Sequence, residues 1–129
     1  MAKILIIDDD PDMVEAMKVV LESRNYQVSI AKTGEEGLRE MRRDKPGLII
    51  LDVMMETADK GFDVAREIKW DPDYKNVPIL MLTAIKERTG MDFGKEAGDE
   101  QWLPVDDYCD KPLHPDELIS KVEALLRKR

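Results

Sequence analysis

The peptide KILIIDDDP, residues 3–11, contains a complete passage from one structural element into the next. Its apolar half, Lys3–Ile7, lacks the polar alternation of a half-exposed strand and predicts a strand covered on both faces of a sheet. Its acidic half leads into Asp10 and Pro11, residue types that are favoured at the N-cap and at the first position of a helix. The peptide therefore predicts a buried strand that is followed at once by a helix.

The same unit recurs along the chain. Three further apolar runs predict strands that are likewise covered on both faces, at Val28–Ala31, Leu48–Leu51 and Pro78–Leu82. A short final strand is expected around Tyr108–Cys109. Strands that alternate with helices five times are typical of a parallel sheet with helices on both faces, joined by right-handed crossovers. The sequence therefore predicts the α/β class.

Helix signals separate these strands. Thr33 and Glu36 form a capping box, in which the threonine hydroxyl accepts a hydrogen bond from the backbone N–H three residues on. Apolar residues recur at helical spacing after Pro11 and after Pro115. We expect helices from Pro11, from Thr33 to near Asp44, at about Phe62–Trp70, at about Met91–Ala97 and from Pro115.

The composition disfavours several classes of function. With 20 Lys and Arg against 28 Asp and Glu, the chain has a formal net charge of −8, which disfavours direct contact with nucleic acid or an anionic membrane surface. One Cys and one His exclude a disulfide framework and a Cys/His zinc site. The apolar runs are far shorter than the ~18 residues of a membrane span, and no export signal is visible. We expect one cytoplasmic domain over residues 1–129.

Side chains that carry chemistry follow four of the five expected strands. They are Asp8 and Asp9 after the first strand, Asp52 after the third, Thr83 after the fourth and Lys111 after the fifth. In an open parallel sheet, ligands gather at the carboxyl ends of the strands. If the first and third strands are neighbours, the three aspartates converge, and their mutual repulsion favours a bound cation. Oxygen ligands of this kind suit Mg²⁺.

An acid cluster with a hard cation, a lysine and a hydroxyl can stabilise a phosphoryl group in transfer. A carboxylate can itself attack phosphorus and form an acyl phosphate. Asp52 is the candidate nucleophile because it stands alone after a central strand, whereas Asp8 and Asp9 form a pair suited to a metal. Each residue also has a purely structural interpretation: Asp8 and Asp9 in a turn, Asp10 as an N-cap, and Lys111 with its proline as ordinary loop chemistry.

Four stretches of the sequence, in this order, resemble the receiver domain of two-component response regulators: Ile4–Asp10, Leu51–Met55, Leu82–Ala84, and Tyr108 with Lys111-Pro112. The resemblance covers essentially the whole chain and points to a single-domain receiver similar to chemotaxis regulators. Such a receiver could be a free-standing regulator, a phosphorelay shuttle, or a part of a longer regulator or hybrid kinase. It implies a flavodoxin-like (βα)5 fold, which is a doubly wound, five-stranded parallel sheet with the strand order 2-1-3-4-5.

The resemblance also implies roles for the acids. Asp52 would take a phosphoryl group from a phosphohistidine on a sensor histidine kinase or a phosphotransfer protein. Asp9, Asp52 and the backbone carbonyl of Met54 would ligate Mg²⁺, and Asp8 would act directly or through water. A domain of this kind catalyses its own phosphorylation and slow dephosphorylation, and it is not otherwise expected to be an enzyme.

The remaining site residues would bind the phosphoryl group and transmit its presence. By the same resemblance, Lys111 would pair with one phosphoryl oxygen and Thr83 would donate a hydrogen bond to another. Tyr108 matches the family's switch aromatic, which turns inward when Thr83 is drawn toward the phosphate. The downstream partner would be a protein that contacts the fourth helix, the fifth strand and the fifth helix, by a shift in population between two packings.

The sequence departs from the family's pattern in two places. Glu56 replaces a usual proline and places another acid near the site, and the segment between Thr83 and Tyr108 is expanded, with Glu100–Val105 as the extra part. Two other residues indicate how fast the aspartyl phosphate is hydrolysed. Met54 and Ile85 are apolar at positions that flank the path of the attacking water in receivers, so we expect the aspartyl phosphate to hydrolyse slowly.

Two other classes of function remain open. One is a Mg²⁺-dependent phosphatase that works through an aspartyl phosphate, although Asp52-Val53-Met54 lacks the second acid of its usual Asp-x-Asp arrangement. The other is a receiver-shaped interaction module that is never phosphorylated, against which the complete set of acids, Thr83 and Lys111 argues. Outside the site, we expect Cys109 to be a buried strand thiol, and Trp70 and Trp102 to be packing or loop anchors.

Overall fold

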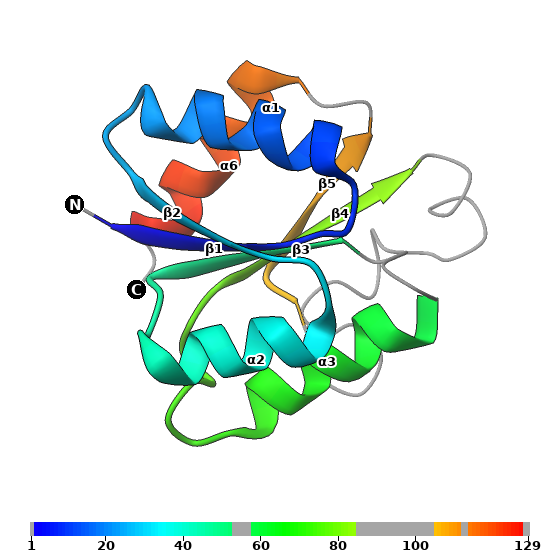
Figure 1. Ribbon diagram of the computed structural model, residues 1–129. Helices are drawn as coiled ribbons and strands as arrows, with labels where there is room; N and C mark the ends of the chain where they lie inside the picture. Colours follow the sequence, from blue (N-terminus) through cyan, green and yellow to red (C-terminus); the bar gives the residue numbers. More distant parts are fainter. Residues whose placement is uncertain (1, 53–57, 85–104, 112–113, 128–129) are drawn as a thin grey trace.

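The computed structural model describes residues 2–52, 58–84, 105–111 and 114–127. Its centre is a parallel sheet of five strands in the order β2-β1-β3-β4-β5 (Figure 1). The strands are β1 (Lys3–Ile7), β2 (Gln27–Ala31), β3 (Leu48–Asp52), β4 (Ile79–Ala84) and β5 (Asp107–Lys111). The predicted α/β class, the parallel sheet and its strand order are confirmed.

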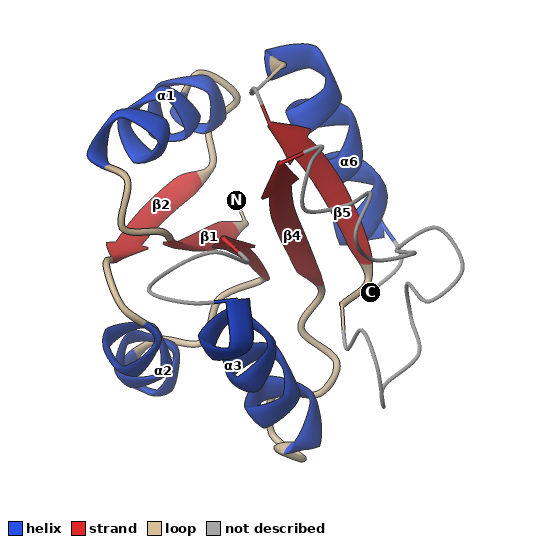
Figure 2. Ribbon diagram, turned by 90° about the vertical axis from the view of Figure 1, so that its right-hand side faces the viewer, coloured by secondary structure: helices blue, strands red, loops and turns tan. Residues whose placement is uncertain are grey.

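The described residues form helices on both faces of this sheet. These are α1 (Pro11–Glu22) and α6 (Pro115–Arg127) on one face, and α2 (Gly34–Arg43) and α3 (Ala58–Trp70) on the other (Figure 1 and Figure 2). The molecule therefore has three layers, with the sheet in the middle, as the alternation of strands and helices predicts.

Strand β1 shows why both faces of the sheet need a cover. Successive side chains of a strand point to opposite faces. Ile4 and Ile6 accordingly join the apolar cluster under α1 and α6, and Leu5 and Ile7 join the cluster under α2 and α3. All four side chains are buried. The run of apolar residues without polar alternation is thus explained by burial on two sides.

The predicted helix starts are confirmed in their hydrogen bonds. The Asp10 carboxylate accepts from the backbone N–H groups of Asp12 and Met13, at 3.0 and 3.3 Å, so Asp10 is the N-cap of α1. The Thr33 hydroxyl accepts from the backbone N–H of Glu36 at 3.1 Å and caps α2. These ends depend on local chemistry alone, which is why the sequence predicts them.

Two predictions about the elements are wrong, and both errors have a physical reason. Val28–Ala31 was predicted to be covered on both faces, but β2 is an edge strand, and within this range only Ala31 is buried. Helix α3 begins at Ala58 rather than near Phe62, because the ~1 kcal/mol that Gly61 costs inside a helix is small enough for the context of the fold to override. The helix expected at Met91–Ala97 lies outside the described residues.

Two predictions about single side chains have opposite outcomes. Cys109 is buried in β5, as expected. Trp70, at the end of α3, is 66% exposed, so the expectation that it anchors the packing is wrong. It lies two residues after the buried Ile68, about 200° around the helix, and therefore points away from the sheet.

The register of the sheet places the strand ends of interest along one edge. Ile7 of β1 pairs with Leu51 of β3, so Asp8 and Asp52 follow at neighbouring positions. Asp52 in turn pairs with Leu82 of β4, and Ala84 pairs with Lys111 of β5. The C-terminal edge of the sheet therefore carries every strand end to which the sequence assigned chemistry.

Candidate functional site

Three aspartates meet at the C-terminal edge of the sheet. One carboxylate oxygen each from Asp8, Asp9 and Asp52 lies within 4.8 Å of the others. Asp52 is the last residue of β3 and is 3% exposed, Asp8 follows β1 and is 1% exposed, and Asp9 is exposed. Within the described ranges, this is the one such group of three or more carboxylate, histidine or cysteine ligands. The expected convergence of the acids is confirmed.

Backbone contacts fix the two buried carboxylates. The Asp8 backbone N–H donates to the Ala31 carbonyl at 3.0 Å and so extends the pairing of β1 with β2. Its carboxylate accepts from the backbone N–H of Asp10 at 2.9 Å, which orients it below the start of α1. Asp52 is held by the ladder between β3 and β4. The site is thus built on rigid strand ends.

The donor set of this cluster fits Mg²⁺. Three carboxylates this close repel one another, and burial of two of them removes the water that would screen the repulsion. A divalent cation among them offsets both costs. All the available ligand atoms are oxygens, which Mg²⁺ prefers, and the exposed side of Asp9 leaves room for the waters that this ion retains.

The other predicted residues are placed only in part. Thr83 lies in β4, opposite Asp110, and Lys111 ends β5, so both backbone positions belong to the same edge as the acids. Met54, Ile85 and Glu56 lie outside the described residues. The structure thus brings the three acids together and places the strand positions of Thr83 and Lys111 along the same edge.

Tyr108 lies in β5 and is half-buried. Its ring packs against the apolar cluster under α2 and α3. The ammonium group of Lys121, from α6, lies 5.6 Å from the centre of this ring and 3.4 Å from the Asp107 carboxylate. A cation this close to the ring face is attracted to it, so α6 and β5 are joined at this tyrosine.

Sequence reasoning missed a lysine beside the acids. Lys32, directly after β2, lines a surface cavity of about 360 Å³ together with Asp8, Asp9 and Glu15. The sequence contained a signal for it, because Lys32 occupies the same position after its strand as Asp8 does after β1.

In the described part of the chain, no helix combines the length and the apolar composition that a membrane crossing requires.

The sequence and the fold of this chain are similar to those of known proteins. The family model of the response regulator receiver domain matches residues 4–123. The DNA-binding response regulator MtrA of Mycolicibacterium smegmatis is 35% identical over 126 residues, which cover 98% of this chain and 51% of that protein. The alkaline phosphatase synthesis transcriptional regulatory protein PhoP of Bacillus subtilis is 38% identical, with coverage of 98% and 49%.

The chain thus spans about half the length of the curated relatives it matches. Among solved structures, the chemotaxis response regulator CheY4 of Vibrio cholerae superposes with a TM-score of 0.81 at 28% identity. The match covers 97% of this chain and 98% of that one.

Proposed function

Because this chain belongs to the response regulator receiver domain family, we propose that Asp52 accepts a phosphoryl group from a phosphohistidine. The donor would be a sensor histidine kinase or a phosphotransfer protein. The observation that carries the proposal is the cluster of Asp8, Asp9 and Asp52 oxygens within 4.8 Å, with Asp52 at the end of a central strand. A purely structural turn needs no third carboxylate from a distant strand.

The reaction transfers one phosphoryl group without other reactants. A carboxylate oxygen of Asp52 attacks phosphorus, and an acyl phosphate P–O bond forms as the P–N bond of the phosphohistidine breaks. The electron pair of that bond remains on the imidazole nitrogen of the donor, which takes up a proton. Asp52 suits this role because the strand ladder orients its carboxylate, and orientation supplies a large part of catalysis in such transfers.

Asp9, Asp52 and the Met54 carbonyl would hold the Mg²⁺, and Asp8 would hold it directly or through water. When bound, the ion neutralises charge that develops on the phosphoryl oxygens. The Asp8 carboxylate is already oriented by the Asp10 backbone N–H, so this ligand needs little rearrangement. Asp9 is the exposed member of the cluster and the one that a ligand from solvent meets first.

Thr83 and Lys111 are proposed to bind the phosphoryl oxygens, and Tyr108 to transmit the change. Their strand positions on the same edge as Asp52 support this assignment. The output would pass through the face formed by β5, by α6 and by the segment that precedes β5. Residues 1–129 would form one receiver domain in the cytoplasm, with a protein rather than nucleic acid as its direct downstream partner.

The decisive experiment measures the mass of the intact protein after incubation with acetyl phosphate and Mg²⁺. We expect the native chain to gain the mass of one phosphoryl group and Asp52→Asn to gain none. Chelation of Mg²⁺ by EDTA should prevent the gain. A native chain that never gains this mass, or an Asp52→Asn chain that still does, contradicts the proposal. Rapid turnover of an aryl phosphate would instead favour the phosphatase.

The lifetime of the acyl phosphate tests the proposed roles of Met54 and Ile85. Apolar side chains cannot orient an attacking water, so we expect slow hydrolysis in the native chain and several-fold faster decay in Met54→Asn. Met54→Leu conserves volume and polarity and should decay like the native chain. Loss of the phosphoryl mass with time gives both rates. Equal half-lives for the native chain and Met54→Asn contradict the assignment.

A further inference from the structure

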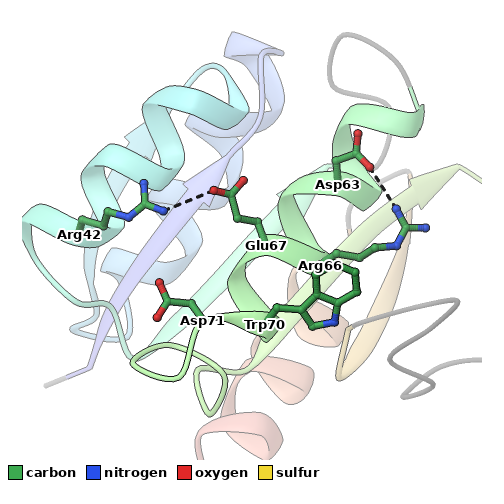
Figure 3. Close-up of a pocket in the computed structure, with 6 residues that line it drawn as sticks. All are labelled: Arg42, Asp63, Arg66, Glu67, Trp70 and Asp71. Carbon is green, nitrogen blue, oxygen red and sulfur yellow. Dashed lines mark hydrogen bonds and ion pairs between the residues drawn. The ribbon is translucent and has the colours of Figure 1, made fainter.

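The end of α3 presents a large aromatic side chain to solvent. Trp70 is 66% exposed, although tryptophan is highly buried on average. It lines a surface cavity of about 610 Å³ that lies along α3, beside the C-terminal end of α2 (Figure 3). We call the lining residues the α2–α3 patch: Arg42, Asp63, Arg66, Glu67, Trp70 and Asp71.

The charged groups of the α2–α3 patch are paired weakly and can exchange partners. Arg42 donates to Glu67 at 3.4 Å across the gap between the helices, and Arg66 donates to Asp63 at 3.1 Å along α3 (Figure 3). Ion pairs on an exposed surface contribute little to stability, because water and salt screen them. Each guanidinium also has five N–H donors, most of which these single contacts leave for another acceptor.

The charged groups of the α2–α3 patch indicate which kind of partner can bind there. It combines two guanidinium groups and three carboxylates around one indole, so a partner surface with charges of a single sign would meet like charges somewhere on it. A second copy of the chain offers both signs at matching positions. A twofold axis makes every contact between two different residues occur twice. Arg42 of one copy would therefore face Glu67 of the other, and Glu67 of the first copy would face Arg42 of the second.

We propose that the α2–α3 patch is a twofold interface between two copies of this chain, with Trp70 at its centre. Tryptophan and arginine are the residue types that dominate binding energy at interface centres. The chain as a whole carries a net charge of −8, which opposes self-association, whereas this patch has nearly balanced charge.

The proposed interface does not depend on phosphoryl transfer. Asp44, next to the end of α2, is bonded by Lys3 at the start of β1, and Lys69 of α3 bonds the Val77 carbonyl just before β4. The C-terminal ends of both helices therefore lie at the N-terminal edge of the sheet, and the acid cluster lies at the opposite edge. Variants of the patch should keep native phosphorylation by acetyl phosphate, which serves as the control for folding.

Sedimentation velocity over a range of protein concentrations tests the interface. We expect a reversible dimer for the native chain and a dissociation constant raised about 30-fold or more in Trp70→Ala. Val19→Ser removes the other large apolar side chain that is exposed among the described residues, at 59% on α1, and should leave the dimer unchanged. A native chain that stays monomeric at every concentration overturns the proposal, and so does a Val19→Ser chain that loses the dimer as Trp70→Ala does.

Charge exchange tests the twofold geometry itself. In Arg42→Glu alone, two glutamates face one another across the axis, and in Glu67→Arg alone two arginines do, so both variants should be monomeric. An equimolar mixture should form a heterodimer, because each glutamate of one copy then faces an arginine of the other. A mixture that stays monomeric contradicts the proposed pairing of Arg42 with Glu67, even where the native chain dimerises.

Discussion

The three consecutive aspartates after β1 have three different environments. Asp10 caps α1 with two hydrogen bonds from backbone N–H groups. Asp8 is buried and accepts the Asp10 backbone N–H, and Asp9 is exposed beside Asp52. Because all three residues are aspartates, residue type alone does not distinguish these roles. The position of the helix start does, since Asp10 is the N-cap of α1, and Asp8 and Asp9 therefore remain available to the site.

At the same scale, Gly37 of α2 allows the helix to approach the residue that precedes this site. A Cβ atom added at Gly37 would lie 2.5 Å from Cδ1 and 2.8 Å from Cγ1 of Ile7, which is fully buried. We predict that Gly37→Ala lowers the free energy of unfolding by roughly 1–3 kcal/mol, because overpacking outweighs the gain in helix propensity. Urea denaturation of the two proteins measures this difference.

Ile7→Val supplies a matched control for this contact. Valine lacks Cδ1, the atom nearest the added methyl group, so Ile7→Val/Gly37→Ala should be more stable than the sum of the two single changes predicts. Additive effects would contradict a clash between the methyl group at residue 37 and Cδ1 of Ile7.

At the scale of elements, one lysine joins three segments. The Lys69 ammonium, at the end of α3, donates to the Val77 carbonyl at 3.1 Å and to the Asp106 carboxylate at 2.8 Å. The same carboxylate accepts from the Ile79 backbone N–H at 2.7 Å. The lysine side chain is only 10% exposed, so water replaces these bonds poorly. This contact ties α3 to the starts of β4 and β5.

We predict that Lys69→Met destabilises the fold by about 1–3 kcal/mol, because the change keeps the aliphatic stem and removes the donor of the part-buried Val77 carbonyl. Thermal and urea unfolding measure the loss. Asp106→Asn is the matched control, since its amide oxygen still accepts from Ile79, and it should cost less than Lys69→Met. A Lys69→Met chain as stable as the native one would show that the contact contributes nothing.

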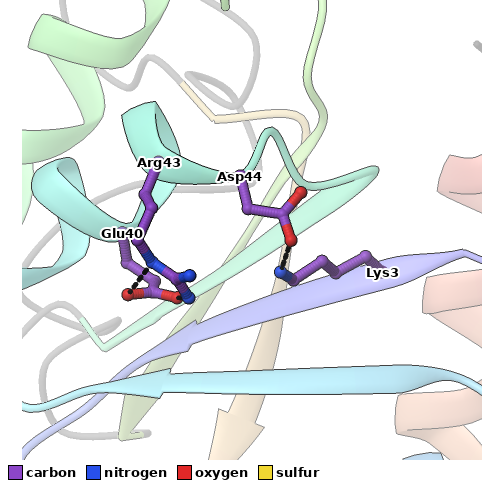
Figure 4. A network of polar contacts seen from close by, with 4 residues as sticks. All are labelled: Lys3, Glu40, Arg43 and Asp44. Carbon is purple, nitrogen blue, oxygen red and sulfur yellow. Dashed lines mark hydrogen bonds and ion pairs between the residues drawn. The ribbon is translucent and has the colours of Figure 1, made fainter.

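A second connection between elements depends on pH. Lys3 of β1 bonds the Asp44 carboxylate at the end of α2, beside the Glu40–Arg43 pair (Figure 4). The hydrogen bond from Lys3 lowers the pKa of Asp44 below its ordinary value of 3.8. A carboxyl group whose pKa is lower in the folded chain stabilises it above the unfolded pKa, and that contribution is lost as pH falls through the folded pKa.

Lys3→Met should therefore be less stable than the native chain at neutral pH, and the difference in stability should shrink as the pH falls below 3.8, the ordinary pKa of the Asp44 carboxyl group. Urea denaturation across this range tests the prediction. Lys45→Met removes a neighbouring lysine that lies over the Tyr74 ring instead. The difference in stability between this variant and the native chain should not shrink in acid. A difference between native chain and Lys3→Met that persists unchanged in acid would contradict the role of Asp44.

The elements also show what a sequence can and cannot predict. The starts at Pro11, Gly34 and Pro115 follow from local bonds and proline geometry, so they were predictable. The exposure of β2 was not, because Val28–Ala31 resembles a central strand, and only the strand order makes it an edge. The exposure of Trp70 could have been predicted from its spacing to Ile68. The prediction that it is buried followed instead from the residue type, because tryptophan is highly buried on average.

At the scale of the molecule, the site exists only because of the topology. Residues 8 and 52 are distant in the sequence, and their carboxylates meet because β1 and β3 are parallel neighbours. The sequence predicts the acids as candidates from their positions after strands. Their proximity follows only once the strand order is given. Lys32 enters the same surface cavity from β2 for the same reason.

This topology predicts a linkage between Mg²⁺ and folding. The unfolded chain separates Asp8 and Asp9 from Asp52, so an ion that needs all three binds the folded chain alone and stabilises it. At ten times the dissociation constant the gain is about 1.4 kcal/mol, or roughly 5 °C in the melting temperature. Melting curves in MgCl₂ should therefore lie above those in NaCl of equal ionic strength.

Asp9→Asn distinguishes the effect of repulsion among the acids on the melting temperature from the effect of ion binding. Removing one carboxylate relieves repulsion, so this variant should melt above the native chain in NaCl and gain less from MgCl₂. Asp12→Asn changes an exposed acid of α1 outside the cluster and should keep the native gain. Equal melting temperatures in the two salts would contradict the binding of Mg²⁺ to the folded chain. Equal gains for Asp9→Asn and Asp12→Asn would place the cation elsewhere on this acidic surface.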